Sequence, residues 1–176
     1  MTKGNCIPCS SGTYSTGVQA SASVSCLQCT SGTYQSGSGQ TSPNSCIFCP
    51  FGTYGTGTGV TICTLCQAGT YQTGTGSSSQ QFCTLCLQGT FLTGSGMISS
   101  SDCTLCRTGT YQTGTGMTSS NECVNCASGT YQTGTGKTSN ASCSMCASGT
   151  YQSEVGMISS TVCIFCGKEC IRQALE

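Results

Sequence analysis

The chain has 176 residues, of which 19 are cysteine and 25 are glycine, and it contains neither tryptophan nor histidine. Charged residues make up only 6 % and the formal net charge is zero, against roughly 25 % charged residues in ordinary globular domains. A chain without a basic patch is not expected to bind nucleic acid. No apolar run approaches the ~20 residues that a membrane-spanning helix needs. Cysteine above ~8–10 % is instead typical of a disulfide scaffold.

The chain divides into three parts. Residues 1–5 contain no apolar segment typical of a signal peptide, and we assign them to a leader or to residues added for expression. Residues 6–166 form a tandem repeat array. Residues 167–176 form a C-terminal cap or tail, with room for one helical turn after Lys168.

The repeat unit is 20 residues long. It begins with two cysteines three positions apart and reads C-x-x-C-x-x-G-T-Y-x-T-G-T-G-x-x-S-x-x-x. Nine C-x-x-C pairs follow one another at this spacing, except that the step from Cys46 to Cys63 is 17 residues. Eight complete units precede the tail. Units this short cannot bury enough surface alone and depend on cross-links and neighbours.

Each unit is expected to form a short β-finger. The glycine before Thr-Tyr marks a turn or a close backbone approach, and Thr-Tyr-x-Thr contains strand-forming residues. The Gly-Thr-Gly and serine-rich stretch predicts a turn and a return. On a continuous strand Tyr71, Thr73 and Thr75 would share one face. No helical periodicity appears before residue 167.

The recurring aromatic residue is expected to pack against the next unit, the alternative being a half-exposed strand residue. The eight positions are Tyr14, Tyr34, Tyr54, Tyr71, Phe91, Tyr111, Tyr131 and Tyr151.

Three chemistries compete for the cysteines. The spacing C-x2-C-x16-C-x2-C fits a zinc ribbon, but a four-thiolate zinc site is negatively charged and the chain has only five Lys and Arg residues to offset that charge. Nine pairs also do not divide evenly into four-cysteine sites. A redox-active C-x-x-C needs a helix N-terminus or a cation beside the thiol, and the sequence offers neither. We therefore favour disulfides and expect no metal or other cofactor.

Bridging the second cysteine of one pair to the first of the next closes every finger, including the 17-residue unit, whose deletion falls inside the loop. The predicted bridges are Cys9–Cys26, Cys29–Cys46, Cys49–Cys63, Cys66–Cys83, Cys86–Cys103, Cys106–Cys123, Cys126–Cys143, Cys146–Cys163 and Cys166–Cys170. Cys6 is left over, as expected if the array continues upstream. Pairing first with first and second with second cysteines across adjacent units remains open.

These disulfides predict an oxidising compartment, so that the chain is extracellular, secreted or on the cell surface. Closing a loop of about 15 residues contributes ~3 kcal/mol in the chain-entropy model. Asn140-Ala141-Ser142 is a glycosylation sequon in a predicted loop.

The unit CxxCxxGTYxTGTGxxSxxxC resembles the ephrin-receptor-like cysteine-rich repeats that occur in tandem in extracellular and cell-surface proteins. It is similar, more distantly, to the cysteine-rich modules of tumour necrosis factor and growth-factor receptors. The resemblance covers residues 6–166 and implies an elongated, non-enzymatic rod with a ladder of disulfides. The chain departs from the pattern by its regular period and its Thr-Gly-Thr-Gly segment. The predicted fold class is thus small, disulfide-rich and all-β, an elongated rod of eight tandem fingers with little conventional core.

The favoured function is a non-catalytic extracellular structural or interaction module, such as a stalk, an adhesion surface or a display rod, in a longer protein. We predict no enzyme, because general-base catalysis lacks a histidine and the abundant Ser and Thr lack an activating base. The Gly-Thr-Gly segments lack the lysine and the helix of a phosphate-binding loop. The expected partners are proteins, or other copies of the chain, along the repeat face.

Two alternatives remain. Threonine rows on a repeat face would make the chain an ice-binding protein, similar to insect antifreeze solenoids, although serine replaces threonine in several units. The residues of this face are Thr56, Thr58, Thr73, Thr75, Thr113, Thr115, Thr133 and Thr135. The other alternative is a self-assembling extracellular fibre, for which low net charge and Gly, Ser, Thr and Gln richness are suited.

Overall fold

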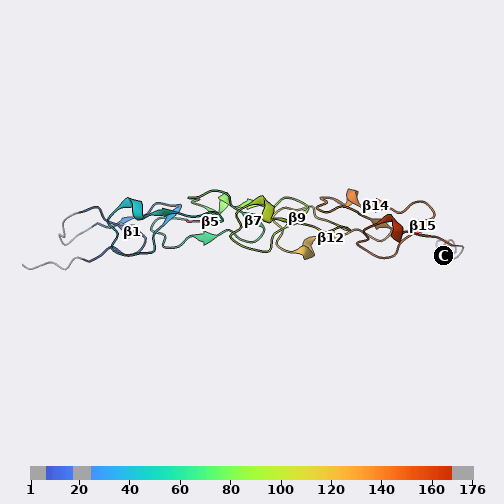
Figure 1. Ribbon diagram of the computed structural model, residues 1–176, viewed down its shortest axis with the longest axis horizontal. Helices are drawn as coiled ribbons and strands as arrows, with labels where there is room; N and C mark the ends of the chain where they lie inside the picture. The colour runs from blue at the N-terminus through green and yellow to red at the C-terminus, as the bar shows by residue number, and fades with distance from the viewer. Residues whose placement is uncertain (1–6, 18–24, 168–176) are drawn as a thin grey trace, which may run out of the picture. The chain divides into compact units, whose positions relative to one another are not determined.

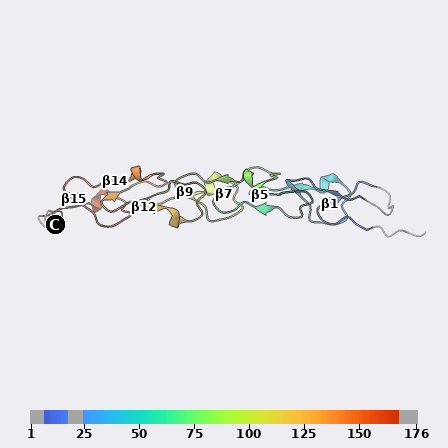
Figure 2. The ribbon, with the colours of Figure 1, turned by 180° about the vertical axis from the view of Figure 1, so that it is seen from behind.

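The computed structural model describes residues 7–17 and 25–167, which fold into short strands and single turns of 3-10 helix joined by loops (Figure 1 and Figure 2). The strands within these residues are β1 Thr13–Tyr14, β2 Leu27–Gln28, β3 Thr33–Tyr34, β4 Ile47–Phe48, β5 Thr53–Tyr54, β6 Thr64–Leu65, β7 Thr70–Tyr71, β8 Thr84–Leu85, β9 Thr90–Phe91, β10 Thr104–Leu105, β11 Thr110–Tyr111, β12 Val124–Asn125, β13 Thr130–Tyr131, β14 Ser144–Met145, β15 Thr150–Tyr151 and β16 Ile164–Phe165. The 3-10 turns are η1 Pro43–Ser45, η2 Gln80–Phe82, η3 Ser100–Asp102, η4 Ser120–Glu122, η5 Asn140–Ser142 and η6 Ser160–Val162. The expected small, disulfide-rich, all-β class is confirmed.

Consecutive strands pair into eight two-stranded sheets, one for each unit. The first arm is the Thr-Tyr of the unit, and the second arm is the middle of the next C-x-x-C pair. In β3 and β4, for example, Thr33 lies opposite Phe48 and Tyr34 opposite Ile47 in an antiparallel register. The second strand of each hairpin therefore lies between the two cysteines of the next pair. Six of the serine-rich stretches end in a single 3-10 turn just before the first of these cysteines.

Each strand is only two residues long, so the expected common face of Tyr71, Thr73 and Thr75 is wrong. β7 ends at Tyr71, and the following Thr-Gly-Thr-Gly segment bends away from the strand. Gly76 has a φ of +73°, outside the pleated region. Its N–H donates to the carbonyl oxygen of Cys49, at 2.8 Å, which holds the bend against an earlier loop. Tertiary hydrogen bonding thus overrides the strand propensity of the threonines.

Eight disulfides close the loops at their base. They join Cys9–Cys26, Cys29–Cys46, Cys49–Cys63, Cys66–Cys83, Cys86–Cys103, Cys106–Cys123, Cys126–Cys143 and Cys146–Cys163. The bridged cysteines are 17 residues apart, except for 14 residues between Cys49 and Cys63. Each pair therefore links the second cysteine of one C-x-x-C to the first of the next. Cys166 forms no bridge within the described residues, and both Cys170, its expected partner, and Cys6 lie outside them.

The interior of the array is built from cysteine, glutamine and threonine instead of large apolar side chains. The second cysteine of seven pairs is buried, from Cys9 to Cys126. Except for Ser15, the residue after the aromatic position is also buried, and it is a glutamine in five of the eight units. These buried residues are Gln35, Gln72, Gln112, Gln132 and Gln152, with Leu92 in the equivalent position of its unit.

The aromatic residues that we expected in the contact between units are mostly half-buried. Tyr54 is buried at 8 % exposure, whereas Tyr151 is 43 % exposed. The backbone around them does reach the next unit, because Tyr14 forms a parallel bridge with Gln40 and Tyr111 forms one with Lys137. The main chain at these positions therefore contributes to the contact between units, beside the buried glutamines.

The chain divides into two compact units, which we describe separately: residues 1–84 with 94–99, and residues 85–93 with 100–176. In the first, the N–H of Gly12 donates to Gln35 O at 2.8 Å, and the N–H of Gly39 donates to Cys9 O at 2.7 Å. In the second, Gly109 donates in the same way to Gln132 O and Gly136 to Cys106 O. Within each compact unit, the loops of neighbouring repeats are thus joined by main-chain hydrogen bonds that run in both directions between them.

Within each compact unit, loops two repeats apart also touch. A Cβ placed on Gly12 would lie 2.1 Å from the carbonyl oxygen of Gly59, and one on Gly109 would lie 2.1 Å from that of Gly156. Both glycines have a φ near +80°, which L side chains rarely adopt. The glycine before each of these Thr-Tyr pairs is therefore required twice, for its backbone conformation and for the close approach of another main chain.

Candidate interaction surface

The exposed large apolar side chains come mainly from the middle of the C-x-x-C pairs. Apart from Cys166, the described cysteines on either side of them form disulfides. The two-residue strands in the middle of these pairs are exposed. Many of these exposed residues are apolar: Leu27, Ile47, Phe48, Leu65, Leu85, Leu105, Val124, Met145, Ile164 and Phe165. Single exposed apolar residues are ordinary, whereas apolar residues that gather into a contiguous patch mark interaction surfaces, so we treat this repeated set as a candidate surface.

The residue directly before the second cysteine of a pair lies against a glycine in the bend of a later loop. A Cβ on Gly136 would lie 2.6 Å from Leu105 Cδ2, and one on Gly96 would lie 2.7 Å from Leu65 Cδ2. Asn125 holds the same position in its unit as Leu65 and Leu105, and its Oδ1 would lie 2.8 Å from a Cβ on Gly156. The bend glycines therefore let these side chains lie against the backbone, which fixes their place on the surface.

The eight threonines proposed as an ice-binding face are all exposed, and they lie in the bends that follow β5, β7, β11 and β13. The serines that replace some of them, Ser36, Ser38, Ser95 and Ser153, are likewise accessible at the surface. None of these segments belongs to a strand of the described residues. They present hydroxyl groups from glycine-rich bends and do not form a continuous extended face.

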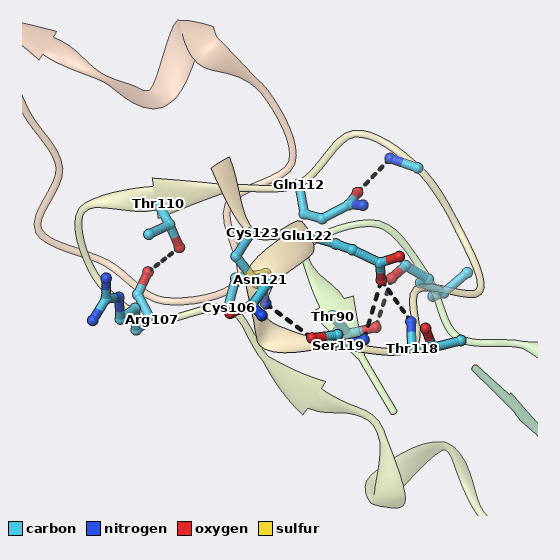
Figure 3. The surroundings of a disulfide bond; sticks show 12 residues. Thr90, Cys106, Arg107, Thr110, Gln112, Thr118, Ser119, Asn121, Glu122 and Cys123 are labelled. Atoms are coloured by element: carbon cyan, nitrogen blue, oxygen red, sulfur yellow. Dashed lines mark hydrogen bonds between the residues drawn. A yellow bond between two sulfur atoms is a disulfide. The ribbon is translucent and has the colours of Figure 1, made fainter. Parts of the chain in front are cut away.

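Local polar bonds hold the turn that leads into each disulfide. In η4 the Ser119 hydroxyl accepts from Asn121 N at 3.2 Å, and the Glu122 carboxylate accepts from Thr118 N at 2.7 Å and Ser119 N at 3.1 Å (Figure 3). This reciprocal arrangement is a capping box. On the other side of the bridge, the Thr110 hydroxyl donates to Arg107 O at 2.7 Å. The Cys106–Cys123 bridge thus joins two segments that are already ordered locally.

Metal ligands do not cluster in the part of the chain that the structure describes. Among the described residues no group of three or more His, Cys, Asp or Glu side chains could hold a metal ion. None of the described segments forms a helix long and apolar enough to cross a bilayer. Asn140 of the sequon is exposed at the start of η5, on the loop where we expected it.

Sequence reasoning missed the buried glutamines. The sequence does contain a sign of them, because Gln follows Tyr in most units, although the repeat pattern writes this position as variable. Gln132 is only 2 % exposed, and its side-chain oxygen accepts from Gly109 N in the preceding loop. The repeated Gln is therefore a tertiary contact between units, as Gln35 is for Gly12.

Comparison with known families agrees with this architecture. The model of the tyrosine-protein kinase ephrin type A/B receptor-like family matches the chain three times, at residues 16–62, 52–103 and 114–163. No curated protein matches the chain. The three matches follow one another in tandem and together cover well over half of the sequence, including most of the disulfide-closed loops. The chain therefore belongs to the tyrosine-protein kinase ephrin type A/B receptor-like family of cysteine-rich repeats.

Proposed function

We propose that the chain is a non-catalytic extracellular module that acts as a spacer and interaction surface within a longer protein. Its many disulfides and its membership of a receptor-type repeat family point to an extracellular or cell-surface location. The observation that carries the proposal is the pattern of cross-links. Each loop is closed at its base by a disulfide and joined to its neighbours by main-chain hydrogen bonds.

This pattern is suited to a spacer because it shortens the path along which tension acts. In the oxidised chain, tension passes across the Cys29–Cys46 bridge and bypasses the 17 residue steps between its cysteines. The path then follows three residue steps to Cys49. The Cα atoms across the bridges are 5.6–5.9 Å apart, and three extended residues span ~11 Å. Even when every non-covalent interaction is broken, each repeat can lengthen to only roughly 17 Å.

We expect single-molecule stretching to show this limit. An oxidised chain held by its two ends should reach a contour length of roughly 17 Å per repeat, whereas the reduced chain should reach ~70 Å per 20 residues. The same molecules measured before and after a phosphine reductant provide the control. An oxidised chain that lengthens by more than ~30 Å per repeat would rule out a cross-linked spacer with this disulfide pairing.

Interaction is proposed through the exposed side chains of the C-x-x-C pairs, which recur along the array. The partner is a protein or a second copy of the chain. The self-association alternative, a fibre, is distinguished by sedimentation of the oxidised chain at increasing concentration, since a fibre grows with concentration and a monomeric module keeps one sedimentation coefficient.

Ice binding is the second candidate, and the accessible threonine hydroxyls are the reason to test it. The threonines lie on glycine-rich bends, whereas a flat ice-matching face requires extended, regularly spaced coils. We therefore expect no gap between the melting and freezing points of a concentrated solution of the oxidised chain. The reduced chain at equal concentration is the control, and a gap present only in the oxidised sample would favour ice binding instead.

A further inference from the structure

The second compact unit contains a shallow pocket of about 400 Å³. It is lined by residues of the β9–β10 hairpin, by Arg107, by the η4 turn and by β12. The residues that matter for its chemistry are Phe91, Leu105, Arg107, Ser120, Asn121 and Asn125. This volume is within the ~300–1,000 Å³ of small-molecule sites.

Three residues of the pocket distinguish it from the equivalent places in other units. Arg107 follows its C-x-x-C pair directly, and in the other seven units this position holds an uncharged residue: Ser10, Thr30, Pro50, Gln67, Leu87, Ala127 and Ala147. Phe91 is the one aromatic position of the eight that is not tyrosine. Asn125 occupies a position that holds Pro8, Gln28, Phe48, Leu65, Leu85 and Leu105 in the earlier units. These two positions vary along the array, but Arg107 is the one charged residue among the eight that follow a C-x-x-C pair in the complete units.

Arg107 brings a positive charge to this pocket. It is one of two cationic side chains in the described part of the chain, with Lys137. No ion pair joins the Arg107 guanidinium to any described residue, and its side chain is exposed. The carboxylate of Glu122, in the neighbouring turn, is engaged by Thr118 N and Ser119 N (Figure 3). A guanidinium of this kind binds carboxylates through two parallel hydrogen bonds.

The remaining walls combine amides with an apolar face. No hydrogen bond among the described residues engages the side-chain amides of Asn121 and Asn125, each of which offers two donors and an acceptor. Asn125 is held over the Gly156 bend. Phe91 and Leu105 supply the apolar lining. An apolar wall beside groups that both donate and accept hydrogen bonds complements a pyranose, which has one CH-rich face and a rim of hydroxyl groups.

We propose that this pocket binds an acidic sugar, a pyranose that carries one carboxylate, with Arg107 on the carboxylate and Asn121 and Asn125 on the hydroxyls. A peptide fits less well, because extended peptides bind to free strand edges. Around the pocket the main chain is already used: Gly89 N donates to Gln112 O and Leu92 N to Met117 O, both at 2.9 Å. The single cation also matches one carboxylate better than a polyanion. This site is separate from the repeated C-x-x-C surface and does not depend on the proposed spacer role.

The test is a titration of the isotope-labelled, oxidised chain with methyl β-D-glucuronide, followed by NMR chemical shifts. Saturable shifts are expected at Arg107, Asn121 and Asn125, with a dissociation constant in the millimolar range for so small a ligand. The neutral methyl β-D-glucoside should bind at least about tenfold more weakly, since it lacks the charged partner of Arg107.

Two variants separate the site from general charge effects. Arg107→Gln should weaken glucuronide binding about tenfold while leaving the remaining spectrum unchanged, and Lys137→Gln, which removes the other described cation, should leave binding intact. Three outcomes would overturn the proposal: equal affinity for the glucoside, no effect of Arg107→Gln, or equally strong binding of a blocked tripeptide with a free C-terminal carboxylate. None of them bears on the stretching behaviour, so this proposal and the spacer role can fail independently.

Discussion

Reduction of the disulfides is expected to unfold the described array completely at room temperature. Each bridge closes a loop with a sequence separation of 14 to 17 residues, and closing a loop of about 15 residues contributes ~3 kcal/mol in the chain-entropy model. The interior cannot replace this contribution, since it consists largely of cysteine, glutamine and threonine. Short units without an apolar core depend on cross-links.

The measurement is an NMR spectrum of the amide groups before and after treatment with a phosphine reductant. We expect dispersed signals to collapse into the narrow range of an unfolded chain. Treatment with a metal chelator is the control and should change nothing, because the described pairs are bridged by sulfur. Loss of structure in the chelator, with persistence in the reductant, would overturn the disulfide ladder and restore the zinc-ribbon interpretation.

Gly109→Ala is expected to destabilise the second compact unit by several times more than Gly129→Ala. Both glycines hold the same repeat position and have a φ of +78°, so both substitutions carry the ~1–2 kcal/mol cost of a left-handed conformation. A Cβ on Gly109 would also lie 2.1 Å from the carbonyl oxygen of Gly156 and 2.7 Å from its carbon. No described atom lies within 4 Å of a Cβ on Gly129. The difference between the variants therefore measures the contact between loops two repeats apart.

Amide hydrogen exchange of the oxidised proteins is the appropriate measurement, because the bridges remain closed and local opening is read residue by residue. In Gly109→Ala, protection should fall at position 109, whose N–H donates to Gln132, and at Gly156, whose N–H donates to Cys126. In Gly129→Ala the loss should stay near the substitution. Equal losses in the two variants would mean that the next-neighbour contact contributes nothing to stability.

The sequence by itself determined the architecture of single repeats. The 20-residue period and the glycine before Thr-Tyr follow from local requirements, whereas the closure of each finger was the favoured one of two disulfide pairings. Sulfur atoms can be joined only across a limited Cα separation, and a left-handed turn needs glycine. The loop between Cys49 and Cys63 is shorter than the others but is closed by the same kind of bridge. Its deletion therefore indicated that the cysteines lie at the base of the loop.

Only the tertiary structure decided how the repeats fit together. Strand propensity predicted that Thr73 and Thr75 continue the strand of Tyr71, but a main-chain bond from Gly76 to Cys49 pulls that segment into a bend. The buried glutamines and the pocket beside Arg107 are made by loops that lie one or two repeats apart along the chain. The repeating pattern of the sequence reveals the residues that a single repeat requires for its own fold. The contacts between repeats depend on how each repeat is rotated and shifted relative to its neighbour. Main-chain hydrogen bonds between loops hold that geometry together with the side chains of the buried glutamines.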